Sequence, residues 1–97
     1  MSKLLPDDIA ALLPPLYATE NIADPIVHVK FFTPDSSWKW FVTEFDPAQR
    51  LCFGLVHGLD KELGYFSLDE LEEVRGPLGL PIERDLYWQS CPLSQCQ

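Results

Sequence analysis

The sequence predicts an α+β domain: a mainly antiparallel meander sheet of four to five strands, packed by two short helices. Three runs rich in β-branched and aromatic residues follow one another along the chain: 26–33, 38–46 and 51–58. The links between them, 34–37 and 47–50, are turn-like, and links this short make consecutive strands antiparallel. Two short segments with leucines at helical spacing flank this region and predict the helices.

The chain has 97 residues, the length of one domain, because two smaller cores would each need metal ions or disulfides. We expect a single domain over 1–97, with flexible ends at 1–5 and 89–97. Apolar residues make up 46% of the chain, which excludes a disordered protein. No apolar run is long enough to cross a bilayer, and Pro6 and Asp7 break the pattern of a signal peptide. We therefore expect no membrane partner.

The first predicted helix begins at Pro6. One face of it carries apolar side chains at helical spacing: Leu5, Ile9, Leu12, Leu13 and Leu16. Proline suits a first helical turn, and Asp7 and Asp8 complement the positive end of the helix dipole. The prolines at 14–15 end the helix, because neither has a backbone N–H to donate. A connecting loop is expected over 17–25.

The predicted strands carry apolar residues on both faces. In the second run, Trp38 and Trp40 face one way, whereas Phe41 and Phe45 face the other. A half-solvated antiparallel sheet would have one polar face. We therefore expect both faces to be covered at least in part, with the C-terminal segment, another subunit or a partner completing the cover. Gly54 indicates a bulge or a close approach, and a fourth short strand is expected over 63–66.

Ser67 and Glu70 form a capping box that begins the second helix. Three apolar residues form its buried face: Leu68, Leu71 and Val74. Its acids are expected mostly to face water: Asp69, Glu70, Glu72 and Glu73. Arg75 suits the negative end, and the following Gly-Pro ends the helix. A stiff coil over 76–85 then leads to a short edge strand at 86–88.

Acidic residues outnumber basic residues by 15 to 7, so the net charge is −8. Such a domain repels phosphate backbones unless its few cations gather on one face, which argues against a nucleic-acid partner. Residues 67–97 carry a net charge of −4, which suits either contact with a basic protein surface or solubility alone.

Three cysteines are too few, and odd in number, for a disulfide framework, so we expect a reducing, cytoplasmic location. Cys52 lies in an apolar run and is expected in the core. Cys91 and Cys96 lie close together in the tail, where they could pair under oxidation or share a metal with outside ligands.

Three stretches of the chain together resemble a known group of bacterial proteins: LPPLY (13–17), VKFFTPDSSWKWFVTEFD (29–46) and ELGYFSLDELEEVRGPLGLPIERDLYW (62–88). The string GPLGLPIERDL is the most specific of them. The chain resembles an uncharacterised bacterial domain-of-unknown-function family of about this length, common on plasmids, phages and integrated mobile elements. This resemblance implies the bacterial cytoplasm and an accessory role in plasmid or phage biology, such as counter-defence against the host. It implies no activity for any residue.

Glu83, Arg84 and Asp85 place a guanidinium between two carboxylates. In an extended segment Arg84 points away from the two acids. Arg84 could clamp a partner's carboxylate or another anion. Alternatively, Arg84 could pin the 76–82 coil to the second helix or to one of two sheet acids, Glu44 and Asp46. The structural role is the more common one for such clusters.

Five acids could supply a divalent-ion site for a metal-dependent hydrolase: Glu44, Asp46, Glu62, Glu83 and Asp85. No metal-binding motif at fixed spacing supports that site. His28 and His57 fall on the first and third predicted strands, roughly 9–10 Å apart, too far to share a metal. No serine has the context of a nucleophile, so we expect no catalytic residue and no cofactor.

Trp38, Trp40 and Tyr65 are the strongest binding candidates, with Trp88 as a further aromatic. Large amphipathic rings dominate interface energetics. Bases could stack on these rings, but the cations of the central region are balanced by acids and form no basic groove. Core packing is the competing interpretation, because so short a chain must bury much of its aromatic area.

We therefore expect a non-enzymatic accessory protein whose partner is another protein. Its predicted binding residues are Trp38, Trp40, Tyr65, Glu83, Arg84 and Asp85. Two alternatives remain open at this stage: a small metal-dependent hydrolase or nuclease-like enzyme, and a nucleic-acid-binding module. Self-association also stays open.

Overall fold

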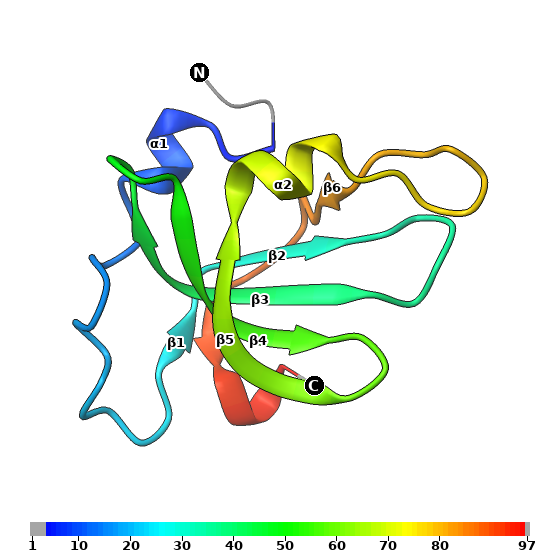
Figure 1. Cartoon of the computed structure of the whole chain (residues 1–97). Coiled ribbons are helices and arrows are strands. Elements are labelled where there is room, and N and C mark those ends of the chain that lie inside the picture. The colour runs from blue at the N-terminus through cyan, green and yellow to red at the C-terminus, as the bar shows by residue number, and fades with distance from the viewer. Residues whose placement is uncertain (1–3, 97) are drawn as a thin grey trace.

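The computed structural model describes residues 4–96 and contains two antiparallel sheets (Figure 1). The larger sheet has the strand order β5-β4-β3-β2-β6. Its strands are β2 (Val29–Phe32), β3 (Lys39–Asp46), β4 (Leu51–His57), β5 (Lys61–Ser67) and β6 (Glu83–Arg84). The smaller sheet pairs β1 (Ile26–Val27) with β7 (Cys91–Pro92). The helices are α1 (Asp7–Ala10), α2 (Leu68–Glu73) and the short 3-10 helix η1 (Leu93–Gln95). The predicted α+β meander is confirmed.

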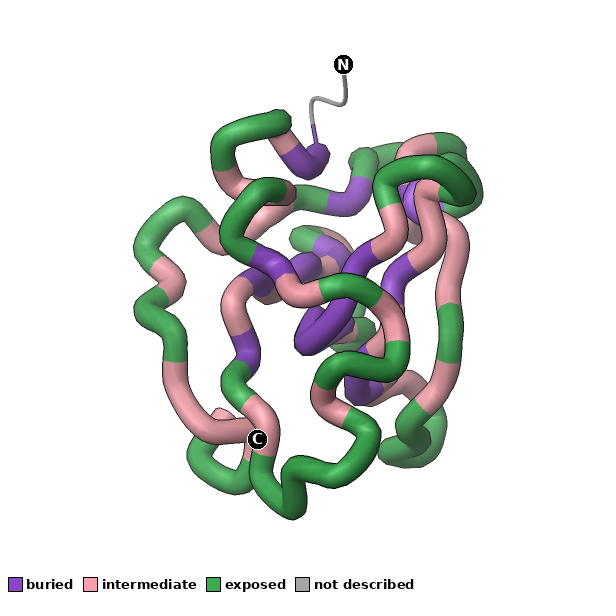
Figure 2. Tube along the Cα trace, turned by 90° about the vertical axis from the view of Figure 1, so that its left-hand side faces the viewer, coloured by how far each residue is buried: buried purple, intermediate pink, exposed green. Residues whose placement is uncertain are grey.

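One face of the larger sheet, called here the helix face, is closed by α1, α2 and the chain beside them. Phe31 and Val42 are fully buried there, and Trp40 is 7% exposed. The same cluster contains Leu4, Leu5, Leu13, Val29, Phe45, Cys52, Leu68, Leu71 and Ile82. Figure 2 shows the buried stretches in the middle of the molecule, surrounded by exposed loops. Each large side chain buried in this way contributes about 1.5–3 kcal/mol to stability.

The opposite face, called the tail face, is covered only in part by residues 4–96. Val27, Phe41 and Leu55 are buried there. The C-terminal segment packs three side chains against them: Trp88, Leu93 and Cys96. The indole nitrogen of Trp88 donates to the Val27 oxygen at 3.1 Å. The C-terminal segment therefore supplies the cover that the sheet pattern required.

The first helix is shorter than the leucine spacing predicted. α1 ends at Ala10; after it the Leu12 and Leu13 amides donate to oxygens three residues back, and the proline at 14 stops any continuation of the helix. Leu13 still reaches the core at 8% exposed, whereas Leu12 is 63% exposed. The predicted apolar stripe was therefore wrong at Leu12.

Two predicted strands also differ from the observed ones. The run 26–33 is interrupted at His28, because β1 pairs with β7 whereas β2 pairs with β3. The edge strand predicted at 86–88 was wrong in position: Tyr87 is 92% exposed, and the strand beside β2 is β6, at Glu83–Arg84.

Two local signals are confirmed. A β-carbon at Gly54 would collide with the backbone oxygen of Phe41, so the close approach of β3 requires glycine. The Ser67 hydroxyl accepts from the Glu70 amide at 3.3 Å and caps α2.

Much of the chain ends expected to be flexible is packed. Leu4 and Leu5 are buried at 8% and 2% exposed. Cys91 and Cys96 form a disulfide, and Asp24 accepts hydrogen bonds from the amide and hydroxyl of Ser94. The remaining end residues, 1–3 and 97, lie outside the described residues. None of the helices within 4–96 has the length and apolar character needed to span a membrane.

Candidate functional site

The two tryptophans predicted to bind share the helix face but differ in exposure. Trp40 is 7% exposed and belongs to the core, as the competing interpretation held, whereas Trp38 is 38% exposed. Their ring centroids lie 6.0 Å apart. The Trp38 ring rests on Gly58, where a β-carbon would collide with it. Only Trp38 of this pair offers a ring to a partner, beside a small cleft of about 240 Å³.

Tyr65 lies on the tail face, because it pairs with Phe53 in the register that also pairs Leu63 with Leu55. Tyr65 is therefore on the other side of the sheet from Trp38. Its ring centroid is 4.9 Å from that of Phe53 and 6.4 Å from that of Tyr17. Partial burial and a hydrogen bond with Tyr17 raise the pKa of Tyr65 above its ordinary value of 10.0.

Arg84 and its two acidic neighbours are separated by the alternation of β6. Arg84 pairs with Phe31 on the helix face, whereas Glu83 pairs with Phe32 on the other. Asp85 accepts from the Tyr87 amide at 3.0 Å and lies 4.0 Å from the Lys30 amine. Arg84 lines a cleft of about 590 Å³, and its buried Nε atom has no hydrogen-bond partner within residues 4–96.

The coil over 76–82 is held by Asp35. The Asp35 carboxylate accepts from the Leu78 amide at 2.8 Å and from the Leu80 amide at 3.3 Å. These bonds do not test the anchor role considered for Arg84, which stays a prediction. Its role in binding a carboxylate also stays a prediction.

The acids considered for a metal site do not gather. Glu44 is 2% exposed and accepts from the Tyr17 and Thr19 amides at 2.8 and 2.9 Å, and from the Thr19 hydroxyl. Asp46 accepts from the Ala48 amide at 3.0 Å. Glu83 pairs with Phe32 of β2, which in turn pairs with Lys39 at the first residue of β3, whereas Asp46 is the last residue of that strand. Within residues 4–96, no three His, Cys, Asp or Glu side chains converge as a metal site would require.

The two histidines also lie far apart. His57 pairs with Lys39 at one end of β3, whereas the His28 amide donates to the Val42 oxygen in the middle of β3. Burial lowers the pKa of His28, which favours its neutral form.

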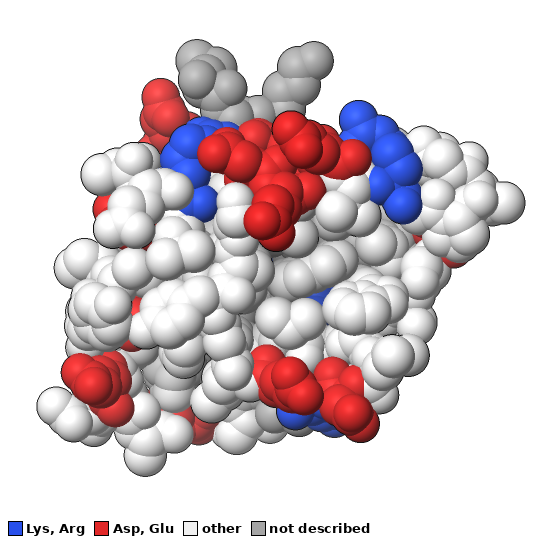
Figure 3. Space-filling view, in the orientation of Figure 1, with Lys and Arg blue, Asp and Glu red and all other residues white. Residues whose placement is uncertain are grey.

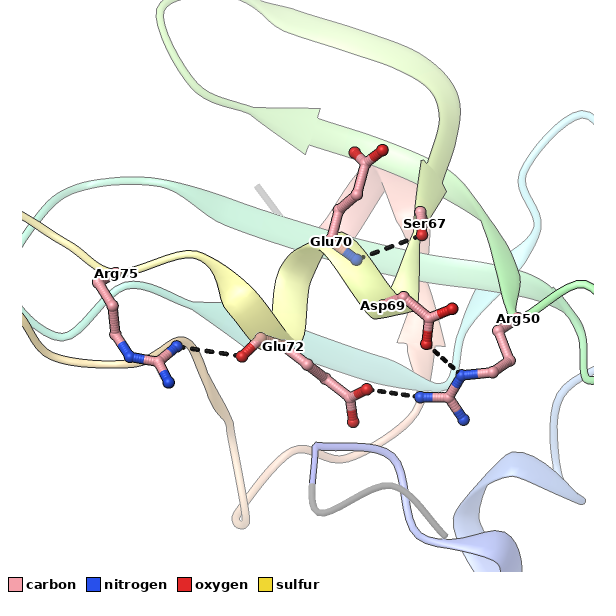
Figure 4. A network of polar contacts seen from close by, with 6 residues as sticks. All are labelled: Arg50, Ser67, Asp69, Glu70, Glu72 and Arg75. Carbon is pink, nitrogen blue, oxygen red and sulfur yellow. Dashed lines mark hydrogen bonds and ion pairs between the residues drawn. The ribbon is translucent and has the colours of Figure 1, made fainter.

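Some of the acids of α2 form ion pairs with an arginine outside the helix (Figure 4). Arg50, in the turn before β4, binds Asp69 through its Nε and Glu72 through its Nη2. As predicted, the acids mostly face water: the Asp69 side chain stays 63% exposed although it binds Arg50, whereas that of Glu72 is 28% exposed. Arg75 closes the helix by donating to the Glu72 oxygen at 3.0 Å. This network joins α2 to the β3–β4 turn.

A surface that sequence reasoning missed lies on the tail face at β4 and β5. We call it the tyrosine patch, and its residues are Tyr17, Phe53, Leu63 and Tyr65. Tyr17, Leu63 and Tyr65 are 63%, 60% and 50% exposed. Glu44 holds the backbone of Tyr17, whose φ is 71°, and so places its ring beside Tyr65. The spacing of Leu63 and Tyr65 in the sequence indicates that they share one face of a strand. No local sequence pattern places Tyr17 beside them.

Comparison with known proteins gives one match. The model of a family described as "Protein of unknown function (DUF2958)" matches residues 4–96. No curated protein and no solved structure matches the chain. Because the family match spans nearly the whole chain and includes the GPLGLPIERDL string, the chain belongs to the DUF2958 family.

Proposed function

We propose that this protein is a non-enzymatic binding protein that acts by contact with another protein, through the tyrosine patch. The observation that carries the proposal is the exposure of Tyr17, Leu63 and Tyr65, at 63%, 60% and 50%, on one continuous surface. Clustered exposed apolar side chains mark interaction sites, and tyrosine combines a large apolar ring with a polar tip. The helix face, by contrast, buries most of its rings.

The charge of the protein indicates a basic partner. The net charge is −8, and Glu20 and Glu44 lie close enough to Tyr65 to act on its ionisation. Figure 3 shows acidic side chains near α2 and at the opposite end of the view, with uncharged surface between them. Such charges steer a basic protein toward an apolar contact and contribute more to the association rate than to affinity.

The biological setting is the part of the proposal that rests on the sequence resemblance. Families carried on plasmids, phages and integrated elements supply accessory proteins that work in the bacterial cytoplasm. A small acidic protein that occupies a basic surface of a host protein fits counter-defence.

Affinity capture tests the proposal. The tagged protein is incubated with extract of the bacterium that encodes it, beside the patch variant Leu63→Lys/Tyr65→Lys. The matched control is Leu78→Lys/Tyr87→Lys, whose side chains are 79% and 92% exposed elsewhere on the molecule. We expect a protein that the wild type and the control retain and the patch variant loses.

Equal retention by all three folded proteins would contradict the patch, and so would the absence of any specifically retained protein. A parallel variant, Trp38→Ala/Arg84→Ala, tests the helix-face residues that the sequence predicted. Loss of the partner in that variant alone would move the contact to the helix face.

A further inference from the structure

The two edges of the larger sheet differ in length and protection. At one edge, β6 has two residues and Pro81 lies just before it. At the other edge, β5 has seven residues, and within residues 4–96 no strand pairs with its outer side (Figure 1). Natural proteins shorten or cover sheet edges, because unpaired N–H and C=O groups invite another strand. The long edge of β5 therefore needs an explanation.

The hydrogen-bond alternation shows which groups of β5 face outward. At one end of the β4–β5 ladder, the Leu68 amide donates to the Arg50 oxygen at 2.9 Å, and residues 58 and 60 are bonded at the other end. Both pairs fall in the register that joins even-numbered residues. Because antiparallel pairs alternate between bonded and non-bonded, the residues bonded to β4 are Glu62, Gly64 and Phe66. Leu63 and Tyr65 therefore direct their N–H and C=O groups away from the sheet.

The same two residues, Leu63 and Tyr65, expose their side chains on the tail face. Outward backbone groups and exposed apolar side chains thus coincide on one stretch of five residues, 62–66. Between them, Gly64 has no atom within 4 Å of the place where a β-carbon would lie, so nothing obstructs the strand on the helix-face side. These are the features that strand addition uses: main-chain bonds for affinity and alternate side chains for specificity.

We propose that the β5 edge binds an extended strand of a partner protein, which pairs antiparallel with residues 62–66. This inference rests on the proposed function and specifies how the contact is made. Residues of the partner opposite Tyr65 and Leu63 lie on the tail face and are apolar. The residue opposite Glu62 lies on the helix-face side and is basic. Read along the partner, the motif is apolar, any, apolar, basic.

Charge selects a different protein rather than a second copy of this chain. Two copies would each bring a net charge of −8 to the contact, whereas a basic segment would be attracted. Glu62 also indicates a basic partner, because this acid belongs to the stretch 62–66 that pairs with the partner strand.

A synthetic peptide tests the pairing. The probe is Thr-Val-Thr-Val-Lys-Thr-Lys, with its two valines opposite Tyr65 and Leu63 and its first lysine opposite Glu62. NMR of the full chain follows the backbone amides at about 1 mM peptide, where millimolar binding is visible. We expect shifts centred on Leu63 and Tyr65, and hydrogen exchange of these two amides slowed about twofold when the peptide occupies half of the protein.

The control peptide is the same sequence N-methylated at both valines, which removes the donors to the Leu63 and Tyr65 oxygens and keeps the side chains. We expect it to bind at least about tenfold more weakly, a difference that corresponds to about 1.4 kcal/mol. Equal binding of the two peptides, or no shifts in β5 with the parent peptide, would overturn the pairing.

A protein variant gives an independent check. Leu63→Pro removes the outward N–H without breaking a bond to β4, and Leu63→Ala removes the same side chain but keeps that N–H. We expect the proline variant to bind the peptide at least about tenfold more weakly than the alanine variant. Equal binding would contradict the edge, and the N-methylated peptide decides the question if the proline variant does not fold.

The failures of the two proposals are distinguishable. If the captured protein is lost by Leu63→Lys/Tyr65→Lys but retained equally by Leu63→Pro and Leu63→Ala, the patch binds a partner and strand pairing is wrong. If the Leu63 amide becomes protected as the concentration of the free protein rises, the occupant is a second copy, which overturns the choice of partner.

Discussion

The two faces of the five-stranded sheet are closed by different means. The helix face buries Phe31, Trp40 and Val42 under α1 and α2. Along the chain, α1 precedes the strands of the meander and α2 follows them. The tail face buries Phe41 and Leu55 under a single C-terminal segment. That segment reaches the β1 side of the sheet and leaves the tyrosine patch on β4 and β5 uncovered by residues 4–96.

Because of this difference, we expect the helix face to determine the stability of the protein and the tyrosine patch to determine its binding to a partner. Substitutions on the helix face leave cavities in close-packed surroundings and lower the free energy of unfolding. Substitutions in the tyrosine patch remove side chains that already contact water, so they change binding more than stability. Substitution, reduction and titration can each test that division, and we expect their effects on the free energy of unfolding to decrease in that order.

The largest effect is expected for Phe31→Ala, because Phe31 is fully buried on the helix face. We expect the free energy of unfolding to fall by about 3–5 kcal/mol in urea titrations. The matched variant Leu63→Ala, at a residue 60% exposed, should cost less than about 1 kcal/mol. Similar losses in the two variants would remove the distinction between the faces.

The next effect concerns the support of the patch. Glu44→Ala leaves the amides of Tyr17 and Thr19 without their acceptor, so unfolding should become easier by about 1.5–3 kcal/mol. Loss of the Tyr17–Tyr65 ring contact should also change the near-ultraviolet circular dichroism of the tyrosines. The control is Asp46→Ala, which removes a single exposed turn bond and should leave that signal unchanged.

Reduction of the disulfide tests the cover of the tail face. Opening Cys91–Cys96 should lower stability by about 2 kcal/mol, the chain-entropy value for so short a loop. Burial raises the pKa of Cys52 to about 12, so this thiol should resist alkylation while the protein is folded. Mass spectrometry should then find two alkylated cysteines after native reduction and three after unfolding. Early labelling of Cys52 would mean that the tail segment also holds the helix face together.

The smallest effect is a loss of stability in mild acid. Burial lowers the pKa of His28 below its ordinary value of 6.5, so the unfolded chain binds this proton more readily than the folded chain. Stability should therefore be complete above about pH 6.5 and fall slightly as the pH drops through that value. Thermal unfolding of His28→Gln should lose this pH dependence, whereas His57→Gln should keep it.

The sequence predicted most of what is local in the fold. Ser67 predicted the start of α2, and Gly54 predicted a close approach, here that of β3 to β4. The short links at 34–37 and 47–50 predicted the antiparallel order of the strands. These signals depend on neighbouring residues, so the pattern is sufficient to read them.

The site depends on contacts between distant residues, which no local pattern encodes. Glu44 holds Tyr17 across 27 positions, and Asp35 holds the amide of Leu78 across 43. Sequence alternation correctly paired Trp38 with Trp40, but it could not tell that one is in the core and that Tyr65 lies on the other face. The open edge of β5 became visible only when the bonded pairs of the ladder were known.

Amide hydrogen exchange of the dilute, unliganded protein tests most directly whether the outer edge of β5 is open. We expect the Leu63 and Tyr65 amides to exchange at close to unprotected rates, whereas those of Gly64 and Phe66 exchange at least about a hundredfold more slowly. Equal protection of all four amides, or protection of Leu63 and Tyr65 alone, would contradict an open edge.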